Sequence, residues 1–461
     1  LGFSIMEATA RPAAGDPTVP PAPLAPAGPG ALRSWYLYDA AISVIDALMI
    51  TFVFGTYLTS GSFGSTEHAT QMLSRGTVVA AVMIAVAAPL IGWLSDRSGR
   101  RSTGIAVFTG IGAACTAACF LVRPEEQLLM LGVVLLSAAN AAKELAVVDY
   151  YATLPGLTSP ESIGRVSGRG WAVGYIFSIL ATAFVLFGFI TPGFVGLPTG
   201  EALNVRAVAL FCAVWCVVLA VPLIVSLRRI EARCPSRRAP GTGGGALAPY
   251  REIVRMVVHL WRTDRRALHF LAASAVFRDG LSAVFAFGGL IAAGTFGFSL
   301  TEVMIFAIAG NLIAGLGALL GGQLDDRLGP KPVIVAALAL VAVAGTALML
   351  LEGKGAFWVC GLALCVAVGP AQASSRSYLG RLTTEGTEGS LYGLYATTGR
   401  AVSFLAPLLF GTAIGVFGEQ RYGILGIVAV VLLGLLMMIG LPTRPRPAVA
   451  AAEAVSTAHT A

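Results

Sequence analysis

Residues 92–101 read GWLSDRSGRR and separate two long apolar runs, and residues 322–331 read GQLDDRLGPK in the same setting, half of the 461-residue chain later. Both stretches fit the pattern G-x-L-x-D-R-x-G-x-(R/K), which suits a short loop between membrane helices. The first glycine lets helices approach closely, the aspartate accepts hydrogen bonds from a neighbouring helix N-terminus, and the second glycine turns the chain. The basic residues hold the loop on the cytoplasmic side. A loop that only sets topology would explain one copy, whereas two copies at this spacing predict two related halves.

The composition excludes a soluble globular protein. Hydrophobic residues make up 56% of the chain and charged residues 12%, with a mean hydropathy of +0.80, whereas a soluble domain carries about 25% charged residues. The net charge of +7 does not predict nucleic-acid binding, because the arginines are confined to short loops between apolar runs. Nearly all of the seven cysteines lie inside apolar segments without histidine or acidic neighbours, so we expect packing residues and no metal site. No nucleotide-binding loop of the G-x-x-x-x-G-K-(S/T) type is present, and we expect no cofactor.

Twelve segments are long and apolar enough to cross a bilayer, which takes about 20 residues each. We therefore predict an all-α integral membrane protein with twelve transmembrane helices in two pseudo-symmetric six-helix bundles. The predicted segments are Trp35–Leu58, Thr77–Leu94, Thr103–Val122, Gln127–Tyr150, Val166–Ile190, Ala207–Leu227, Leu268–Gly294, Thr301–Gly321, Val333–Leu351, Phe357–Ser375, Ser390–Val416 and Tyr422–Leu441.

Basic residues gather in alternate loops, and the positive-inside rule then puts both termini in the cytoplasm. The predicted units are a disordered tail over 1–33, a bundle over 34–227, a linker over 228–264, a second bundle over 265–441 and a disordered tail over 442–461. Both tails are rich in proline and alanine, and Met6 is a candidate start residue after Leu1–Ile5. Within the linker, Tyr250–Trp261 is amphipathic and is predicted to lie on the membrane surface. The alternative is a solvated linker.

Polar and ionisable residues gather on four of the twelve segments. Each charge at the centre of a bilayer costs about 2.5–3.5 kcal/mol, so these residues are expected to face the protein interior. In the first segment Asp39, Ser43 and Asp46 are spaced four and three residues apart and share one helix face. The others are Lys143 and Glu144 in the fourth segment, Arg278 and Asp279 in the seventh, and Gln372, a polar neighbour of the charges, in the tenth.

The paired loops resemble the signature loop of the major facilitator superfamily, which joins helices 2 and 3 and again helices 8 and 9. Other segments resemble one branch, the vacuole effluxer-like transporters, whose namesakes release amino acids from fungal vacuoles. The resemblance implies the major facilitator fold and a central cavity lined by helices 1, 4, 7 and 10. Members of the branch usually carry asparagine near Ile42 and Tyr151 and at Arg278, where this chain differs. The matching segments are WYLYD (35–39), GRVSGRGWAVGY (164–175), DGL (279–281), GPAQASSRS (369–377) and YGLY (392–395).

A site inside the cavity is predicted from the ionisable residues. The cations would meet a carboxylate or another anionic part of a substrate, and one of the carboxylates would carry a coupled proton. The alternative is that Lys143–Glu144 and Arg278–Asp279 are internal ion pairs that only compensate each other. The predicted substrate-binding residues are Asp46, Lys143, Arg278 and Gln372, and the predicted proton-coupling residues are Asp46, Glu144 and Asp279.

A second group of charges is predicted to form a gate at the cytoplasmic ends of the helices, where salt bridges would close the inner mouth of the cavity. Arg381 belongs to the same cluster, and Arg400 could belong to the gate or to the cavity. Asn311 is predicted to hydrogen-bond to a neighbouring helix. The predicted gate residues are Asp39, Asp96, Arg97, Arg100, Asp149, Arg165, Arg169, Asp326, Arg327, Arg376 and Arg400.

These features predict a secondary transporter in the cell (inner) membrane that works by alternating access, is coupled to protons and exports a small polar metabolite, with an amino acid as the cargo that the resemblance implies. Two alternatives are an importer of an anionic solute and a non-transporting membrane scaffold or sensor. The expected partners are a small-molecule substrate, the lipid bilayer and protons, without nucleic acid, and we expect a monomer. No nucleophile–base constellation is present, so we expect no enzymatic activity.

Overall fold

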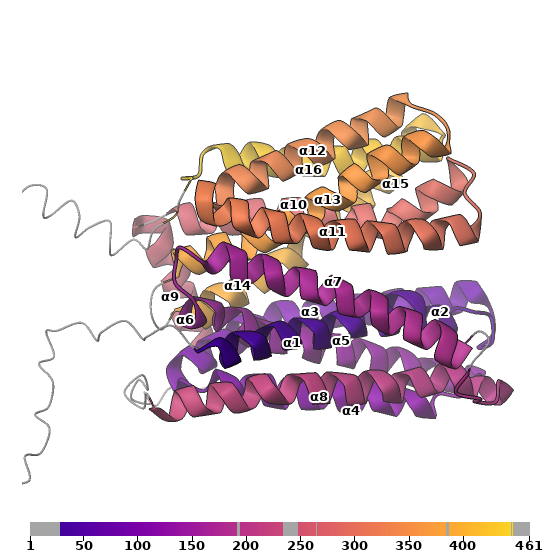
Figure 1. Ribbon diagram of the computed structural model, residues 1–461, viewed down its shortest axis with the longest axis horizontal. Coiled ribbons are helices and arrows are strands. Elements are labelled where there is room, and N and C mark those ends of the chain that lie inside the picture. Colours follow the sequence, from indigo (N-terminus) through magenta and orange to yellow (C-terminus); the bar gives the residue numbers. More distant parts are fainter. Residues whose placement is uncertain are drawn as a thin grey trace, which may run out of the picture.

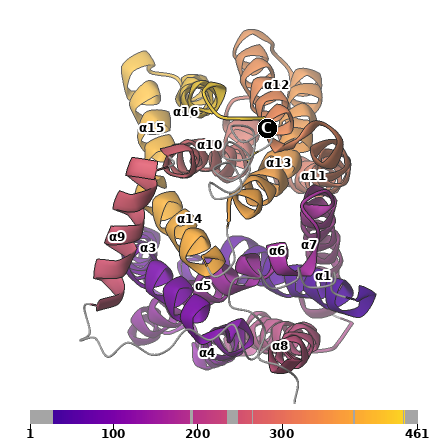
Figure 2. The same ribbon diagram turned by 90° about the vertical axis from the view of Figure 1, so that its left-hand side faces the viewer.

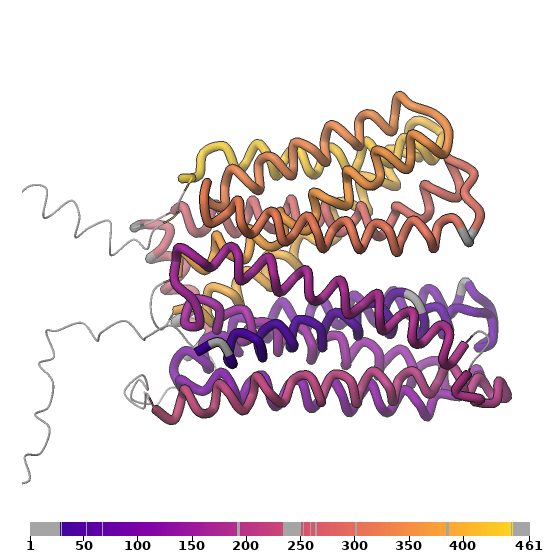
Figure 3. Tube along the Cα trace, viewed as in Figure 1, coloured from indigo at the N-terminus to yellow at the C-terminus, as the bar shows by residue number. Residues whose placement is uncertain are grey.

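The computed structural model describes residues 28–190, 194–233, 248–263, 265–383, 387–443 and 445, and nearly all of these residues are helical, with no strand among them. Long helices run side by side in two groups (Figure 1). The groups are successive halves of the chain: in the tube view the indigo and purple residues lie in the lower group, and the orange and yellow residues lie mainly in the upper group (Figure 3).

Six spans form the first half. The first span is α1 (Pro29–Val44), which continues through the π-helix η1 (Ile45–Phe52) into α2 (Phe54–Leu58). The remaining elements are α3 (Thr66–Ser98), α4 (Arg101–Ala118) with η2 (Cys119–Leu121), η3 (Glu126–Leu128) with α5 (Leu129–Ala152), the short α6 (Leu154–Leu157), α7 (Ile163–Val185) with the π-helix η4 (Leu186–Ile190), and η5 (Gly200–Ala202) with α8 (Leu203–Arg233).

Six more spans form the second half, which follows a linker helix, α9 (Ala248–Thr263). The eleventh span is divided into α14 and α15 by a short turn. The elements are α10 (Arg265–Gly294), α11 (Leu300–Leu328), α12 (Pro330–Leu350), α13 (Lys354–Leu382), α14 (Glu388–Val402), α15 (Leu405–Phe417), and η7 (Gln420–Tyr422) with α16 (Gly423–Ile439).

The described chain contains twelve helices that are long and apolar enough to cross a membrane, which confirms the predicted number of spans. Some helices extend beyond the predicted apolar segments. Helix α3 begins at Thr66 rather than Thr77, and α8 continues to Arg233 rather than ending at Leu227. The reason is that polar turns prolong a helix past the bilayer, whereas hydropathy registers only its apolar part.

Both ten-residue repeats lie at the same end of the bundle, because successive spans alternate in direction and each repeat follows an even-numbered span. We call this end the loop end. The linker helix α9 and both ends of the described chain lie there too, on the left of Figure 1.

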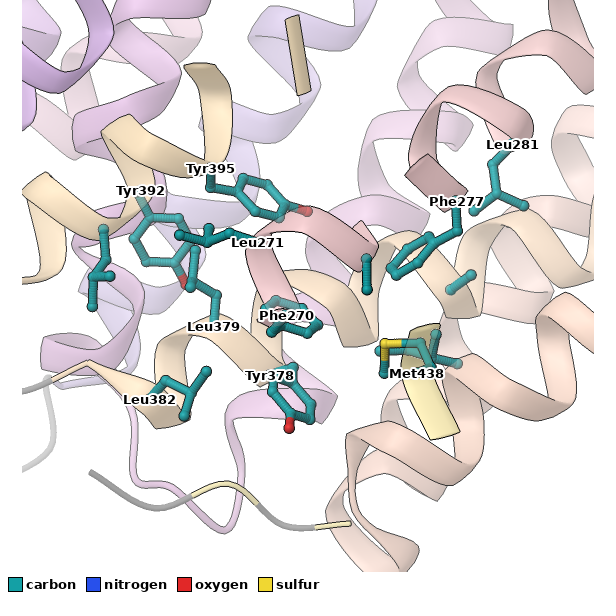
Figure 4. Packing of buried hydrophobic residues seen from close by; sticks show 14 of the residues in the cluster. Phe270, Leu271, Phe277, Leu281, Tyr378, Leu379, Leu382, Tyr392, Tyr395 and Met438 are labelled. Atoms are coloured by element: carbon teal, nitrogen blue, oxygen red, sulfur yellow. The ribbon is translucent and has the colours of Figure 1, made fainter. Parts of the chain in front are cut away.

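Apolar packing joins the halves at the loop end and leaves them separate at the opposite end. One buried cluster contains Phe270 of α10 and Tyr378 of α13, whose rings stack with centroids 4.1 Å apart, and it extends to Leu145 of α5 in the first half (Figure 4). Toward the opposite end, the cluster around Phe54 contains only first-half residues, and the cluster around Phe357 contains only second-half residues.

Three spans depart from regular α-helix geometry. The first span is π-helical over Ile45–Phe52, the fifth ends as a π-helix over Leu186–Ile190, and a turn at 403–404 separates α14 from α15. In the first span the Thr51 hydroxyl donates to the carbonyl oxygen of Asp46, five residues earlier, at 3.0 Å. That spacing matches the π turn, and π turns inside α-helices often occur at functional sites.

The linker helix α9 lies at one edge of the loop end. Viewed from that end, the spans point toward the viewer, and α9 runs along their left-hand side and packs against α3 and α10 (Figure 2). The Tyr250 hydroxyl anchors it by donating to the carbonyl oxygen of Val86 at 3.3 Å. The exposed residues of α9 include apolar Val254 and Trp261 together with arginines. The amphipathic linker is therefore helical, and its placement on a membrane surface stays a prediction.

Candidate functional site

The first repeat holds the loop end of α3 against the start of α14. Asp96 Oδ1 accepts a hydrogen bond from the backbone N–H of Gly389 at 2.8 Å, and Oδ2 accepts from the backbone N–H and the hydroxyl of Ser390 at 2.7 Å each. A Cβ on Gly92 would collide with the carbonyl oxygen of Gly389, so the two backbones touch. Gly99 has a φ of 61° and ends α3. The predicted roles of the aspartate and of both glycines are confirmed for this copy.

The second repeat holds α11 against the start of α7 in the same way. Asp326 Oδ1 accepts from the backbone N–H of Gly164 at 2.9 Å, and Oδ2 accepts from the backbone N–H of Arg165 at 3.2 Å. A Cβ on Gly322 would lie 2.6 Å from the carbonyl oxygen of Gly164, and Gly329 turns the chain with a φ of 95°. Helix α14 belongs to the second half and α7 to the first, so each repeat attaches its own half to the other half.

Guanidinium groups reinforce both contacts. Arg101 donates to Asp96 Oδ1 at 3.0 Å and to Glu388 Oε2, at the start of α14, at 2.9 Å. Arg165 Nε donates to Asp326 at 3.1 Å, and Arg381 pairs with Asp325. Sequence reasoning did not place Arg101, Asp325 or Glu388 in the gate. An alignment of the two repeats could have identified Arg101 and Asp325. Arg101 is the last residue of the first repeat, and Asp325 is an additional carboxylate directly before Asp326 in the second.

Arg376 forms a third contact between the halves, deeper in the protein. Its side chain is 1% exposed, and its guanidinium lies 3.4 Å from Asp39 Oδ2. The same group donates from Nε to the Ser167 hydroxyl at 2.9 Å and from Nη2 to the Ser167 carbonyl oxygen at 2.7 Å. It also lies over the rings of Trp35 and Tyr151, at 4.7 Å and 4.8 Å from their centroids. A buried cation with this many partners rigidly links α13 to α1, α5 and α7.

The other predicted gate residues occupy different surroundings. Asp149 is fully buried, and neither of its carboxylate oxygens has a hydrogen-bond partner among the described residues. The Arg97 guanidinium lies 4.8 Å from the ring centroid of Trp93, one turn earlier in its own helix. Arg100, Arg169 and Arg327 are exposed.

A cavity of about 780 Å³ lies between the halves, beyond these contacts and toward the opposite end. Its wall is mainly apolar, and Asp46 is the only charged side chain among the lining residues of the described chain. The π-helical segments η1 and η4 contribute lining residues, as do α7, α10, α11 and α13. The fourth span contributes none, which corrects the expectation that helix 4 lines the cavity: its charged side chains lie behind Asp46.

Asn311 of α11 also lines this cavity. Its Nδ2 donates to the carbonyl oxygen of Ala307 in its own helix at 2.8 Å. The predicted hydrogen bond to a neighbouring helix is therefore wrong, because the side chain faces the space between the halves.

Four charges form a chain that starts at the cavity wall and ends in the other half. Asp46 is 50% exposed and accepts a hydrogen bond from Lys143, which is 7% exposed. Lys143 Nζ lies 3.0 Å from Glu144 Oε1, and Arg400 Nη2 lies 2.9 Å from the same oxygen. These four charges sum to zero, but the carboxylate of Asp46 is the one that faces the cavity. Arg400 reaches Glu144 from α14, so this chain is a further bridge between the halves.

Arg278 and Asp279 are neighbours that interact with different partners. The Arg278 guanidinium lies 3.8 Å from the ring centroid of Tyr395 and donates to the carbonyl oxygen of that residue at 3.4 Å. Asp279 Oδ2 accepts from the backbone N–H of Ala406 at 2.6 Å, at the start of α15. Of the two predicted internal ion pairs, the structure forms Lys143–Glu144 and uses Arg278 and Asp279 separately. Neither Arg278 nor Gln372 is among the residues that line the cavity.

Solved structures with this fold define the class of protein. The proton:xylose symporter XylE of the major facilitator superfamily aligns with a TM-score of 0.67 and 15% identity, over 91% of this chain and 96% of that one. A bacterial homologue of the iron transporter ferroportin, in an outward-facing state, aligns with a TM-score of 0.64 and 16% identity, over 89% and 98%. The chain therefore belongs to the class of multi-pass membrane proteins that have the major facilitator fold.

Within that class, the family described as "Vacuole effluxer Atg22 like" matches residues 63–446, and the chain belongs to this family. The uncharacterized MFS-type transporter YxiO of Bacillus subtilis is 21% identical over 413 residues, which are 89% of this chain and 94% of that protein. Autophagy-related protein 22-2 of Neosartorya fischeri is 25% identical over 334 residues, which are 66% of this chain and 54% of the fungal protein. This chain thus spans about half the length of the fungal relatives that it matches. The resemblance predicted from the sequence is confirmed.

Proposed function

We propose that this protein is a secondary active transporter that exports a small organic metabolite by alternating access, driven by protons, across a cell membrane. The supporting observation is closure at one end only. At the loop end, Asp96, Asp326 and Arg376 each bond to residues of the other half. Toward the opposite end, a cavity of about 780 Å³ separates the halves. A site between two halves that is sealed on one side is what alternating access requires.

The charge of the loops supports one orientation of the protein in the membrane. Exposed arginines are present in both repeats at the loop end, and basic loops favour the cytoplasmic side. The loop end is then cytoplasmic, together with both ends of the described chain, and the cavity faces outward. The matching family is described as vacuole effluxer-like, and the resemblance supports a cargo related to amino acids.

Coupling to protons would use carboxylates whose partners change as the halves move. Glu144 is held by Lys143 from its own half and by Arg400 from the other half, so opening of the loop end would remove one of its two cations. Asp46 faces the cavity and can be reached by water or substrate. Asp279 holds the start of α15 through Ala406, where a change of charge would loosen the broken eleventh span.

The alternative of anion import has less support from this geometry. It would need a cation on the cavity wall, but Lys143 and Arg278 do not line the cavity and are engaged by other groups. The alternative of a non-transporting scaffold would not need ionised residues beside a cavity of this size. Charges inside a membrane protein are expensive to maintain unless they are functional.

Proteoliposome flux combined with distance measurements tests the proposal. Panels of amino acids, amines and organic acids would be followed with and without an imposed pH gradient. Spin labels at Arg229→Cys with Leu328→Cys would report on the loop end, and labels at Ser62→Cys with Val416→Cys would report on the opposite end, with the native cysteines replaced. We expect the two distances to change in opposite directions and flux to follow the gradient. Constant distances in both pairs together with absent flux would reject transport.

A further inference from the structure

The cavity wall specifies a charge for the cargo. We propose that the transported molecule is an organic cation with an apolar body, and that its ammonium group binds Asp46. This inference rests on the proposed transport function, and it names the substrate class of the same cavity. It departs from the sequence-based prediction, in which Arg278 and Lys143 bind an anionic part of the substrate.

The first argument is the position of charge around the cavity. Asp46 is the only charged lining residue in the described chain, and half of its side chain is exposed. Its internal partner Lys143 lies behind it with 7% of its side chain exposed. The neutral chain of four charges therefore presents its negative end to the cavity. This end attracts a cation and repels an anion.

The second argument is a second acceptor at the same depth in the other half. Ser43, one turn before Asp46, lies against Gly174 of α7, where an added Cβ would lie 3.4 Å from its Cβ. Gly315 of α11 lies against Tyr175, with the corresponding distance also 3.4 Å. Asn311 is one turn nearer the opposite end than Gly315, which brings it close to the level of Asp46.

Asn311 completes this acceptor pair. Nδ2 uses one of its two hydrogens on Ala307, so the acceptor Oδ1 and one N–H remain for a ligand. An ammonium group has only donors, so Asp46 can bind it, and Asn311 Oδ1 offers a further acceptor on the wall formed by the other half. Contacts to both halves are also what a cargo needs if it is to influence their relative movement.

The third argument is the apolar and aromatic character of the remaining wall. Trp171 and Tyr175 line the loop-end side of the cavity, with ring centroids 5.7 Å apart. Aromatic faces bind ammonium groups, and more strongly where water is excluded. The rest of the wall is largely aliphatic and phenylalanine-rich, including Ile179, Phe285 and Met304. About 780 Å³ is within the range of cavities that hold drug-sized molecules, so the body of the ligand can be large and apolar.

Binding of matched ligands tests the charge directly. Tryptamine, tryptophol, 3-indolepropionate and tryptophan share one indole body and carry a cation, no charge, an anion and a zwitterion. Isothermal titration calorimetry on the purified full-length protein in nanodiscs at pH 7 would compare them. We expect tryptamine to bind at least tenfold tighter than each of the others. Equal affinities, a preference for the anion or the zwitterion, or no binding of tryptamine would overturn the proposal.

Variants then assign the effect to the proposed acceptors. Asp46→Asn should lower the affinity for tryptamine at least tenfold and leave the affinity for tryptophol unchanged. Asn311→Leu should lower the affinity for tryptamine several-fold. The matched control is Glu352→Gln, which neutralises a carboxylate that is 86% exposed and lies outside the cavity. Gel filtration and melting curves would show that each variant is folded. If the Asp46→Asn protein is unfolded, Asp46→Glu serves instead, and it should retain the preference for tryptamine.

The spin-label distances separate this inference from the transport function. A protein whose two ends move in opposite directions but which does not prefer tryptamine would be a transporter of another substrate class. A protein whose ends do not move would fail as a transporter whatever it binds.

Discussion

The two copies of the loop make the same backbone contact and complete it with different cations. In both copies an aspartate caps a helix of the other half and a glycine allows close approach: Asp96 at the start of α14 and Asp326 at the start of α7. In the first copy Arg101, the last residue of the repeat, bonds to Asp96 and to Glu388 of the other half. The corresponding Lys331 of the second copy instead donates to the carbonyl oxygens of Ile439 and Leu441, in its own half, at 2.6 Å each.

The comparison indicates that the fold requires the capping aspartate, whereas the cation that neutralises this aspartate can differ between the halves. A helix N-terminus presents unpaired backbone N–H groups, and a carboxylate satisfies two of them at once, so the aspartate has little freedom. A guanidinium can reach the same carboxylate from several helices. In the second copy the cations are Arg165 of α7, 3.1 Å from Asp326, and Arg381 of α13, which lies 3.5 Å from Asp326 and pairs with Asp325. The repeats therefore share a capping bond and differ in the residue that neutralises it.

The largest effect is expected at the glycines. In Gly92→Ala the added Cβ would collide with the carbonyl carbon and oxygen of Gly389, and both are backbone atoms that can move only with the helix. Overpacking of this kind destabilises by about 1–3 kcal/mol. We expect the loop-end spin-label distance to lengthen and flux to fall below about a tenth of wild type, as tenfold corresponds to about 1.4 kcal/mol.

Gly322→Ala should change the loop-end distance and the flux in the same direction but by less. The reason is that the added Cβ would lie 2.6 Å from its nearest atom, the carbonyl oxygen of Gly164. Gly110→Ala is the matched control, since nothing lies within 4 Å of an added Cβ there. Normal flux in Gly92→Ala would show that close contact between α3 and α14 is not needed.

The next effect is expected at the capping aspartates. Asp96→Asn removes the charge that accepts three hydrogen bonds from α14 at 2.7–2.8 Å, and hydrogen bonds to charged groups contribute about 1.5–3 kcal/mol. Asp326 accepts two backbone bonds of 2.9 Å and 3.2 Å, so the loss of its charge in Asp326→Asn should have a smaller effect. We expect the closed population at the loop end, measured with the same spin labels, to fall in the order wild type, Asp326→Asn, Asp96→Asn. The reverse order would mean that the second copy dominates closure.

The fold could be predicted from the sequence because its signals are local or repeated. Apolar segments identify spans one at a time, and the two repeats indicate the division into halves and the kind of partner, a helix N-terminus, that Asp96 and Asp326 bind. The π turn at Asp46 and the break before Leu405 could not be predicted, because they depend on how a helix packs against its neighbours rather than on composition. Hydropathy also places a residue in a span without fixing the direction of its side chain.

The site could be predicted only in part, for the same reason. The sequence indicated that Asp46, Lys143 and Glu144 are interior charges, and the structure brings them together. It did not indicate that Arg278 would lie over Tyr395, away from the cavity, because a cation and an aromatic ring on different helices leave no shared pattern. Nor did it indicate that Trp171 and Asn311 would line the cavity, since neither residue is charged and their roles depend on the gap between halves.

The smallest effect on closure is expected at Lys331, and it addresses the difference between the copies directly. Lys331 donates to carbonyl oxygens near the end of α16, where a cation stabilises a helix C-terminus by about 0.3–1 kcal/mol. Lys331→Gln should therefore lower the melting temperature slightly and leave the loop-end distance and flux within about twofold of wild type, a change of about 0.4 kcal/mol.

Arg101→Gln is the matched variant at the equivalent position, and it removes bonds to Asp96, Glu388 and the carbonyl oxygen of Ala152. It should open the loop end several-fold more than Lys331→Gln. If the two variants had equal effects, the hydrogen bonds, which differ between the two positions, could not be the cause. The positive charge, which both positions share, would then act through the membrane surface.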